Sequence, residues 1–338
     1  MNIKKLLTTI DTHTAGGPTR IITGGLPPLP GKSVAEKAEH FQAHHDGIRK
    51  LLVLEPRGHR DMYGAVVTES LHPDADVGAF FFTASGYLPA CVHSAIGVAT
   101  AGLSTGTMGV RPDGTIRMEV PAGVISLSPQ TRDGDVASIA IQTNPAFVHT
   151  PSAQIKLDDA RSINASIVFS GVFFALVDIG QLDVPRTPSG ALIGPENAQV
   201  LRALGVQILD KANQQIKVHH PQNPAATAIA LVMFYEPLED NHARDIVIGV
   251  SGAIDRSPCG AGTGAMVTNL FTMGSLQANQ EYVLESFLGT RFTGRIVEAA
   301  TVGSFHGAVP EIRGSAYITG MHQFVLEVGD PLNEGLAM

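Results

Sequence analysis

Residues 259–274 read CGAGTGAMVTNLFTMG, and residues 91–106 read CVHSAIGVATAGLSTG. Each stretch opens on one of the chain's two cysteines, and in each a threonine stands nine positions and a glycine fifteen positions after the cysteine. Both stretches predict a helix, because Gly106 and Gly274 stand where a left-handed C-terminal cap would end one. The sequence therefore predicts two similar halves, each with a cysteine at a helix N-terminus.

The repeat extends beyond these helices, because Glu119 and Gly123 have the same spacing as Glu285 and Gly289. Hydrophobic periodicity and turn residues predict alternating helices and strands along the rest of the chain. Helices are expected over 34–50, with Ser33 as N-cap, and over 195–204, ended by Gly205. Strands are expected over 51–54, 64–68, 78–83 and 172–177. This alternation indicates an α/β protein.

Length and composition exclude several classes of protein. The 338 residues are about twice the roughly 150 expected of one domain, and 44% of them are hydrophobic, so two buried cores are expected. The net charge of −8, without a Lys/Arg run, argues against a nucleic-acid partner. No apolar run approaches the about 20 residues that span a bilayer, and the N-terminal apolar stretch is too short for a signal peptide, so a cytoplasmic protein is expected.

Two cysteines exclude a disulfide-stapled scaffold and make each thiol a candidate for chemistry. A helix N-terminus lowers the pKa of a thiol and binds anions such as carboxylates. If the two halves face one another, one thiolate can remove a proton from the alpha carbon of an amino acid while the opposite thiol protonates its other face. This inversion requires no cofactor. The adjacent pairs His44, His45 and His219, His220 point different ways and predict no metal site.

The residues around both cysteines resemble the proline racemase family, whose pattern is similar to DRSPCGAGTGA over 255–265 and GYLPACVHSAIG over 86–97. Further stretches carry the resemblance along nearly the whole chain, namely DTHTAGGPTR from Asp11, EPRGHRDMYGAV from Glu55, VHHP from Val218, ESFLGT from Glu285 and GSAYITG from Gly314. The resemblance implies a diaminopimelate-epimerase-like α/β fold of two similar domains with the active site in the cleft between them. Residues 1–130 plus 317–338 would form the domain with Cys91, and residues 131–316 the domain with Cys259.

The resemblance also implies roles for individual residues. Cys91 and Cys259 would alternate as acid and base on proline or a hydroxyproline. Backbone NH groups of Val92, Gly260 and Ala261 would hold the substrate carboxylate. His93 and Asp255 would approach the ring nitrogen. The family uses no cofactor or metal, and a homodimer is the commonest assembly of such chains.

Three residues depart from the family pattern, which usually has MCGH where this chain has ACVH, and Thr where it has Ala261. Val92 in place of Gly adds bulk and restricts the backbone, so the preference among ring substituents could shift. Three alternatives to an inverting enzyme stay open. They are a trans-3-hydroxyproline dehydratase, a non-catalytic binder of cyclic amino acids, and a redox switch through a Cys91–Cys259 disulfide. Cys259 argues against the dehydratase, because such enzymes commonly have Thr at that position.

Overall fold

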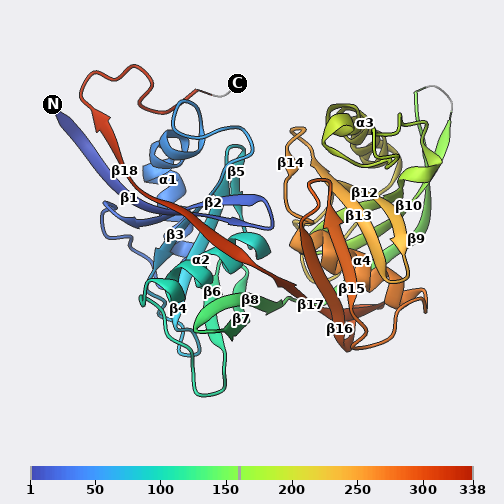
Figure 1. The fold of residues 1–338 in the computed structure, drawn as a ribbon, viewed down its shortest axis with the longest axis horizontal. Helices are drawn as coiled ribbons and strands as arrows, with labels where there is room; N and C mark the ends of the chain where they lie inside the picture. The colour runs from blue at the N-terminus through green and yellow to red at the C-terminus, as the bar shows by residue number, and fades with distance from the viewer. Residues whose placement is uncertain (1, 159–160, 337–338) are drawn as a thin grey trace. The chain divides into compact units, whose positions relative to one another are not determined.

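The computed structural model describes residues 2–158 and 161–336, which divide into two compact units (Figure 1). Of the described residues, 2–141 and 314–336 form the first unit, and 142–158 and 161–313 form the second. The sequence predicts borders at 130/131 and 316/317, and the first of them would cut a hairpin. Its strands are joined by a two-residue turn at Asp133 and Gly134, both with positive φ, as a tight hairpin turn requires. The border between the two units therefore lies at the end of the hairpin, between residues 141 and 142.

The first unit is built on one mixed sheet. In it β18 pairs with β1, β1 with β2, β2 with β3, β3 with β4, and β4 with both β5 and β6; β7 pairs with β6. The pairs β2–β3 and β4–β6 are parallel and the others are antiparallel. The elements are β1 (Ile3–Thr14), β2 (Gly17–Gly24), α1 (Val34–Val53), β3 (Tyr63–Thr68), β4 (Val77–Thr83), β5 (Gly86–Leu88), α2 (Val92–Ser104), β6 (Ile116–Val120), β7 (Gly123–Arg132), β8 (Asp135–Gln142) and β18 (Ala316–Glu327).

Two helices pack against this sheet in different ways. Helix α1 packs on β3 and β4, and helix α2 packs on β1, β2, β3 and β18. Burial shows the difference between them, since α1 buries one face whereas α2 is buried over ten consecutive residues, 93–102. The small side chains of α2 allow strands to approach it closely, so α2 forms part of the core rather than its cover.

In the second unit the strands close on themselves. The pairing runs β9–β10–β11–β12–β13–β15–β16–β17, and β17 returns to β9 through Gly307↔Phe147 and Ala308↔Ala146. The elements are β9 (Ala146–Lys156), β10 (Ser162–Ser170), β11 (Val172–Asp178), η1 (Ile179–Gln181), η2 (Pro195–Asn197), α3 (Ala198–Gln215), β12 (Ile229–Glu239), β13 (His242–Gly249), β14 (Ile254–Asp255), α4 (Gly260–Thr272), β15 (Tyr282–Ser286), β16 (Arg291–Val302) and β17 (Phe305–Gly314).

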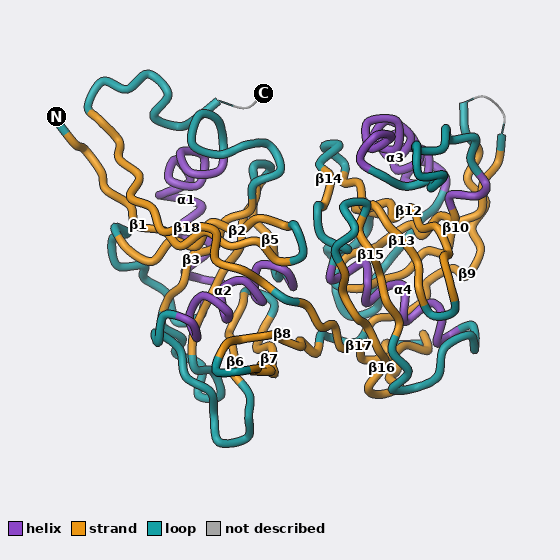
Figure 2. Tube along the Cα trace, viewed as in Figure 1, coloured by secondary structure: helices purple, strands orange, loops and turns teal. Residues whose placement is uncertain are grey.

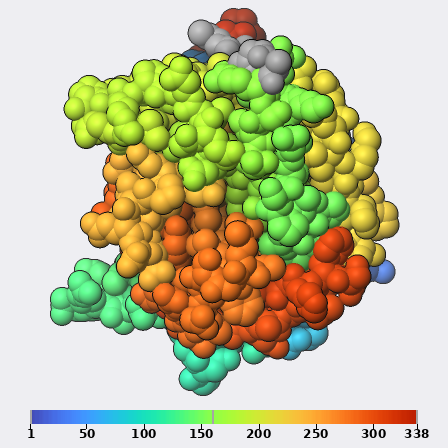
Figure 3. Space-filling model, turned by 90° about the vertical axis from the view of Figure 1, so that its right-hand side faces the viewer, coloured from blue at the N-terminus to red at the C-terminus, as the bar shows by residue number. Residues whose placement is uncertain are grey.

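Helix α4 packs against β9, β10, β11 and β16 from this ring of strands, and Figure 2 shows it with strands on several sides. Its residues 262–269 are buried one after another. Close contact is possible because Gly294 of β16 faces Thr263 and Val267, where an added Cβ would lie 2.7 Å and 3.0 Å away. Helix α3 instead lies at the surface of this unit and packs on β12 and β13 (Figure 3).

Several predicted elements are confirmed and two are wrong in part. Ser33 caps α1, because its Oγ accepts from the Glu36 backbone NH at 3.2 Å. In place of the strand expected over 51–54, residues 51–53 form the last turn of α1 and Leu54 is its C-cap, and all four apolar residues are buried. Gly205 does not end a helix but lies inside α3, where a Cβ would come within 2.7 Å of Ile248. That glycine serves close helix–sheet packing.

The internal repeat predicted from the sequence is present as a repeated structural unit. In the first half β4 is followed by β5, α2 and β6, with β4 antiparallel to β5 and parallel to β6. In the second half β13 is followed by β14, α4 and β15 with the same pairings. Glu119 and Glu285 are both buried in the strand after the helix, and Gly106 and Gly274 have φ of 69° and 75° as the caps require. In each half the cysteine lies at the same point of this repeat, directly before the helix.

Candidate active site

Cys91 is the N-cap residue of α2 and is partly exposed. Its backbone is extended, with φ −152° and ψ 111°, and its carbonyl accepts the first helical hydrogen bond from Ala95 at 2.9 Å. The Cys91 Sγ lies 3.6 Å from His93 Nδ1, 3.9 Å from His93 Nε2 and 3.3 Å from Ser94 Oγ. Two polar side chains of the first helical turn therefore contact this sulfur.

The surroundings of Cys91 favour its thiolate. Burial raises the pKa of Cys91, but the charge of His93 and the hydrogen bonds with His93 and Ser94 act in the opposite direction and outweigh it. The pKa of Cys91 is consequently lowered from the ordinary value of a thiol. A thiolate is the form that can remove a proton from carbon.

The β1–β2 hairpin holds the two polar residues of this turn in place. Thr14 Oγ1 donates to the His93 carbonyl at 2.7 Å, and the hydroxyls of Thr19 and Ser94 lie 3.0 Å apart. The His93 ring is buried against the Tyr63 ring, at 4.4 Å between centroids in an edge-on arrangement. Thr14 and Thr19 thus hold the first turn of α2 beside Cys91.

Cys259 is the N-cap residue of α4 and is buried. It has a positive φ of 53°, a left-handed conformation that costs an L-residue roughly 1–2 kcal/mol. In this conformation its sulfur accepts a hydrogen bond from the backbone NH of Gly262 at 3.3 Å, and its carbonyl accepts from Thr263 at 2.7 Å. The strained backbone thus turns the thiol back over the helix N-terminus.

Asp255 and Ser257 form the turn that leads into Cys259. Asp255 Oδ1 accepts from both the NH of Ser257, at 2.9 Å, and its hydroxyl, at 2.8 Å. The Ser257 Oγ in turn accepts from the Cys259 NH at 3.2 Å. All three residues are buried, so this chain of bonds fixes the carboxyl group next to the second thiol.

The surroundings of Cys259 favour its neutral thiol. Burial and the neighbouring negative charge of Asp255 raise the pKa of Cys259 well above its ordinary value, and the Gly262 NH, which acts in the opposite direction, does not compensate. The two cysteines therefore differ in the form that each half of the chain stabilises, thiolate at Cys91 and thiol at Cys259.

The residues that follow each cysteine supply backbone donors. The first NH groups of a helix have no partner within it and carry part of the positive end of the helix dipole. Val92 and His93 contribute such groups in α2, and Gly260 and Ala261 contribute them in α4. The side chains of Val92 and Ala261 are partly buried and pack against the apolar cluster of their own unit.

Two residues of the site were not predicted from the sequence, namely Ser94 and Ser257. Each lies within three positions of a cysteine, Ser94 after Cys91 and Ser257 before Cys259. A hydroxyl three residues after an N-cap lies in the first helical turn, which is a signal that sequence reasoning could have used. Ser257 carried no such signal, because its role depends on the turn at Asp255.

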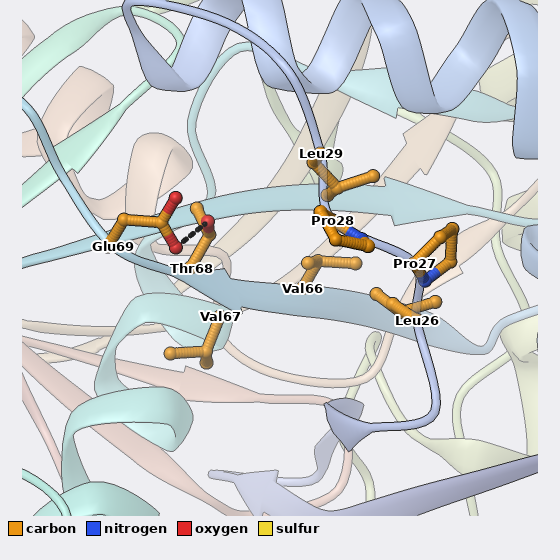
Figure 4. A pocket seen from close by; sticks show the side chains of 8 residues that line it. All are labelled: Leu26, Pro27, Pro28, Leu29, Val66, Val67, Thr68 and Glu69. Atoms are coloured by element: carbon orange, nitrogen blue, oxygen red, sulfur yellow. Dashed lines mark hydrogen bonds between the residues drawn. The ribbon is translucent and has the colours of Figure 1, made fainter.

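A groove elsewhere in the first unit contains none of these residues. Its lining, drawn in Figure 4, consists of the Pro-rich segment 26–29 and residues 66–69 at the end of β3. Within the lining, Thr68 Oγ1 donates to Glu69 Oε2 at 3.2 Å, and Lys37 Nζ bonds both residues from α1. The side chains of Thr68 and Glu69 are thus bonded within the unit.

Two further features bear on the kind of protein this is. Among the described residues, no helix combines the length and the apolar character needed to cross a membrane. Within residues 2–158 and 161–336, no cluster of three or more His, Cys, Asp or Glu side chains is arranged to hold a metal ion.

Comparison with known proteins gives matches along the whole chain. The family model described as proline racemase matches residues 9–337. A proline racemase from Clostridioides difficile is 38% identical over 341 residues, which cover 100% of both chains. A trans-3-hydroxy-L-proline dehydratase from Bacillus cereus is 32% identical over 341 residues, again covering 100% of both chains.

A solved structure has a similar fold over the full length. The hydroxyproline epimerase from Agrobacterium vitis, with bound trans-4-hydroxy-L-proline, has a TM-score of 0.87 and 30% sequence identity to this chain. The match covers 100% of this chain and 97% of that one. The similarity confirms the predicted α/β fold class of two similar, diaminopimelate-epimerase-like halves.

Proposed function

Because this chain belongs to the proline racemase family, we propose that it is a cofactor-independent racemase or 2-epimerase that inverts the alpha carbon of proline or a hydroxyproline. It is an enzyme of that family, and the relatives named racemase and epimerase are isomerases. The observation that carries the proposal is the pair of thiols at equivalent helix N-termini, one in surroundings that favour a thiolate and one in surroundings that favour a thiol.

In the proposed reaction Cys91 is the base and Cys259 the acid. The Cys91 thiolate takes the alpha hydrogen as a proton, and the electron pair of the broken C–H bond is delocalised towards the substrate carboxylate. Cys259 then gives its proton to the opposite face of the carbon, and the electron pair forms the new C–H bond. Cys91 ends as thiol and Cys259 as thiolate, so the reverse reaction begins from that state.

Helix N-termini stabilise the charge that develops in this reaction. We place the substrate carboxylate at the NH groups of Val92 and His93 and of Gly260 and Ala261, whose orientation the helices fix before the substrate binds. Negative charge increases on the carboxylate as the alpha proton leaves, so these donors bind the transition state more strongly than the substrate. Thiols and helix termini suffice for each step, and the proposal includes no cofactor.

Asp255 and His93 are proposed to face the ring nitrogen of the substrate, as the family resemblance implies. Asp255 Oδ2 takes no part in the two bonds from Ser257, so it can accept from a ring ammonium. His93 contacts the sulfur of Cys91, so its second proposed role is to stabilise the thiolate. Assembly as a homodimer and a cytoplasmic location stay predictions from the sequence.

The test is NMR in D2O with L-proline, trans-4-hydroxy-L-proline and trans-3-hydroxy-L-proline, using wild type, Cys91→Ser and Cys259→Ser. We expect deuterium to enter the alpha carbon of the substrate as its configuration inverts, and this result identifies the substrate. Both reactions should be slower in the two Cys→Ser variants. A Ser275→Ala variant, changed at an exposed residue beyond the end of α4, is the matched control and should keep wild-type exchange.

Other results would overturn the proposal in distinguishable ways. Loss of water from the 3-hydroxy compound, with no inversion of any substrate, would assign the chain to the dehydratases, one of which is 32% identical to it. Binding without proton exchange would leave a binder of cyclic amino acids. Unchanged inversion after either Cys→Ser substitution would exclude the two-thiol mechanism.

A further inference from the structure

Asp245 is a fully buried carboxyl group that the proposed reaction does not use. It lies on β13 and has 0% exposure, and neither carboxyl oxygen has a hydrogen-bond partner among the described residues. An unpaired buried carboxylate is costly, so such a group in a folded protein requires an explanation.

The sheet register places Asp245 near Asp255, the residue four positions before the second thiol. Val247 pairs with Asp255 across β13 and β14, and Asp245 is two residues from Val247, on the same face of the strand. Asp245 and Asp255 are therefore diagonal neighbours, a relationship that brings Cβ atoms to within about 7–8 Å. Val247 and Cys259 belong to one apolar cluster, so this face of β13 is the one that underlies the N-terminus of α4.

The neighbours of Asp245 on the adjacent strands and on helix α4 supply no cation. Tyr235 of β12 and Ser286 of β15 are its cross-strand partners, and Asp178 of β11 pairs with Tyr235 in the same row. Helix α4 has no charged side chain. Helix α3, which carries Arg202 and Lys211, packs on the other face of β13, where Gly205 meets Ile248.

The nearby cations of the described chain do not bond the Asp245 carboxyl group. Arg244 precedes Asp245 on the strand and points to the opposite face, where it bonds Glu285. Arg256, which follows Asp255, has an interaction of its own.

Three acidic groups thus share one apolar region, namely Asp255, Asp245 and Cys259. Asp255 accepts two hydrogen bonds from Ser257, whereas Asp245 accepts none from the described residues. A second negative charge there is opposed by burial and by repulsion from Asp255, and both effects raise the pKa of Asp245 well above its ordinary value. The charge of Asp245 likewise contributes to raising the pKa of Cys259.

We propose that Asp245 is a positioning residue that keeps the proton on Cys259. Its buried carboxyl group competes with Cys259 for ionisation and so holds Cys259 in the thiol form in the free enzyme. Cys91 then carries the thiolate, and the free enzyme accepts the stereoisomer whose alpha hydrogen faces Cys91. This inference rests on the proposed function for its catalytic meaning, but the protonation of Cys259 can be measured without any substrate.

The test is a pH titration of thiolate ultraviolet absorbance in a Cys91→Ser background, where Cys259 is the one remaining cysteine. Adding Asp245→Asn should move the Cys259 midpoint to lower pH by about one unit, as expected when one of two coupled acids is removed. Asp240→Asn, at the exposed turn between β12 and β13, is the matched control and should leave the midpoint unchanged.

Two further variants separate a proton-holding role from a structural one. Asp245→Glu keeps an ionisable group, so its Cys259 midpoint should equal that of the protein with Asp245. Asp245→Leu lacks an ionisable group, so it should shift the midpoint as Asp245→Asn does. The Leu variant also provides the test if the Asn variant does not fold. An unchanged Cys259 midpoint in the folded Asn or Leu variant would overturn the proposal, as would an equal shift in Asp240→Asn.

Activity provides a second readout on the enzyme with both cysteines. The alkaline limb of kcat/KM reports loss of the thiol that donates the proton, so Asp245→Asn should move this limb to lower pH, and an unmoved limb in an active variant would also count against the proposal. A Cys259 titration that shifts while no proline substrate undergoes exchange would refute the proposed function and leave the role of Asp245 intact.

Discussion

The ring of His93 lies against the sulfur of Cys91, with Nδ1 at 3.6 Å and Nε2 at 3.9 Å, two residues along the same helical turn. The charge of His93 is the main influence that offsets burial in setting the pKa of Cys91. Replacing His93 by Gln removes that charge, so Cys91 should bind its proton more tightly. We expect alkylation of Cys91 at neutral pH to slow about tenfold, as for loss of a hydrogen bond to a charged group.

The measurement is the rate of reaction with iodoacetamide against pH in a Cys259→Ser background. The whole profile should move to higher pH in His93→Gln, while the rate at high pH, where the thiol is fully ionised, stays the same. His72→Gln, in an exposed turn of the same unit, is the matched control. A profile in His93→Gln that coincides with that of the control would show that His93 does not stabilise the thiolate.

The turn that carries the second thiol gives a prediction about stability. Ser257→Ala removes a hydroxyl that bonds Asp255 Oδ1 at 2.8 Å and the Cys259 NH at 3.2 Å. Because both partners are buried and lose a bond, the free energy of unfolding should fall by about 1–3 kcal/mol. Urea unfolding measures this, with exposed Ser275→Ala as control. Equal midpoints for the two variants would contradict the role given to Ser257.

The chain's repeated stretches predicted the helices, their caps and the position of both cysteines, because each of these depends on neighbours along the sequence. Gly205 shows where such reasoning fails. A glycine near a predicted helix end favours a cap, but Ile248, 43 positions away, requires a residue without Cβ there, and the helix continues. The strand expected over 51–54 failed similarly, since a short apolar run does not distinguish a strand from a buried helix turn.

Within the candidate site, the sequence predicted the residues that follow the family pattern but not those that depend on folding. Ser257 and Asp245 carry no motif of their own. Asp245 comes near Asp255 only through the register of β13 and β14. In the sequence it is one acidic residue within an apolar strand, which does not by itself indicate a functional position. Long-range pairing, rather than local preference, determines these positions.

Close packing of α2 on the β1–β2 hairpin gives a prediction for Gly97. A Cβ at this position would lie 2.6 Å from Thr12 Oγ1, which is buried in β1. Gly97→Ala gains up to about 1 kcal/mol in helix propensity but must displace a buried strand, which costs about 1–3 kcal/mol. We expect a lower thermal midpoint and, because the hairpin holds His93 and Ser94, slower exchange at the alpha carbon.

Gly109→Ala is the matched control for Gly97→Ala, because a Cβ at Gly109 meets no atom within 4 Å and its backbone needs no positive φ. It should change the free energy of unfolding by less than about 0.5 kcal/mol. A Gly97→Ala protein as stable and active as the control would show that the hairpin yields without cost and that the contact does not position the site.

The buried carboxyl of Asp245 predicts an unusual dependence of stability on pH. Burial and then the charge of Asp255 raise the pKa of Asp245 well above its ordinary value, whereas in the unfolded chain the group ionises near that ordinary value. Between these two pKa values the folded protein binds more protons than the unfolded chain, so stability falls as pH rises through that range. Asp245→Asn removes this loss. It should match wild type near pH 3 and exceed it at pH 7.

We expect a gain of about 1–3 kcal/mol at neutral pH, because the amide cannot ionise and so removes the cost of a buried ionisable group, whereas near pH 3 both side chains are neutral and equally unpaired. The measurement is urea unfolding of wild type, Asp245→Asn and the control Asp240→Asn at both pH values. The quantity compared is the change in the free energy of unfolding of each protein between the two pH values. An Asn variant less stable than wild type at pH 7 would mean that the Asp245 carboxylate has a stabilising partner in the folded protein. The same variant should be more stable yet catalyse less well at high pH, because the charge that costs folding energy is the one that keeps the proton on Cys259.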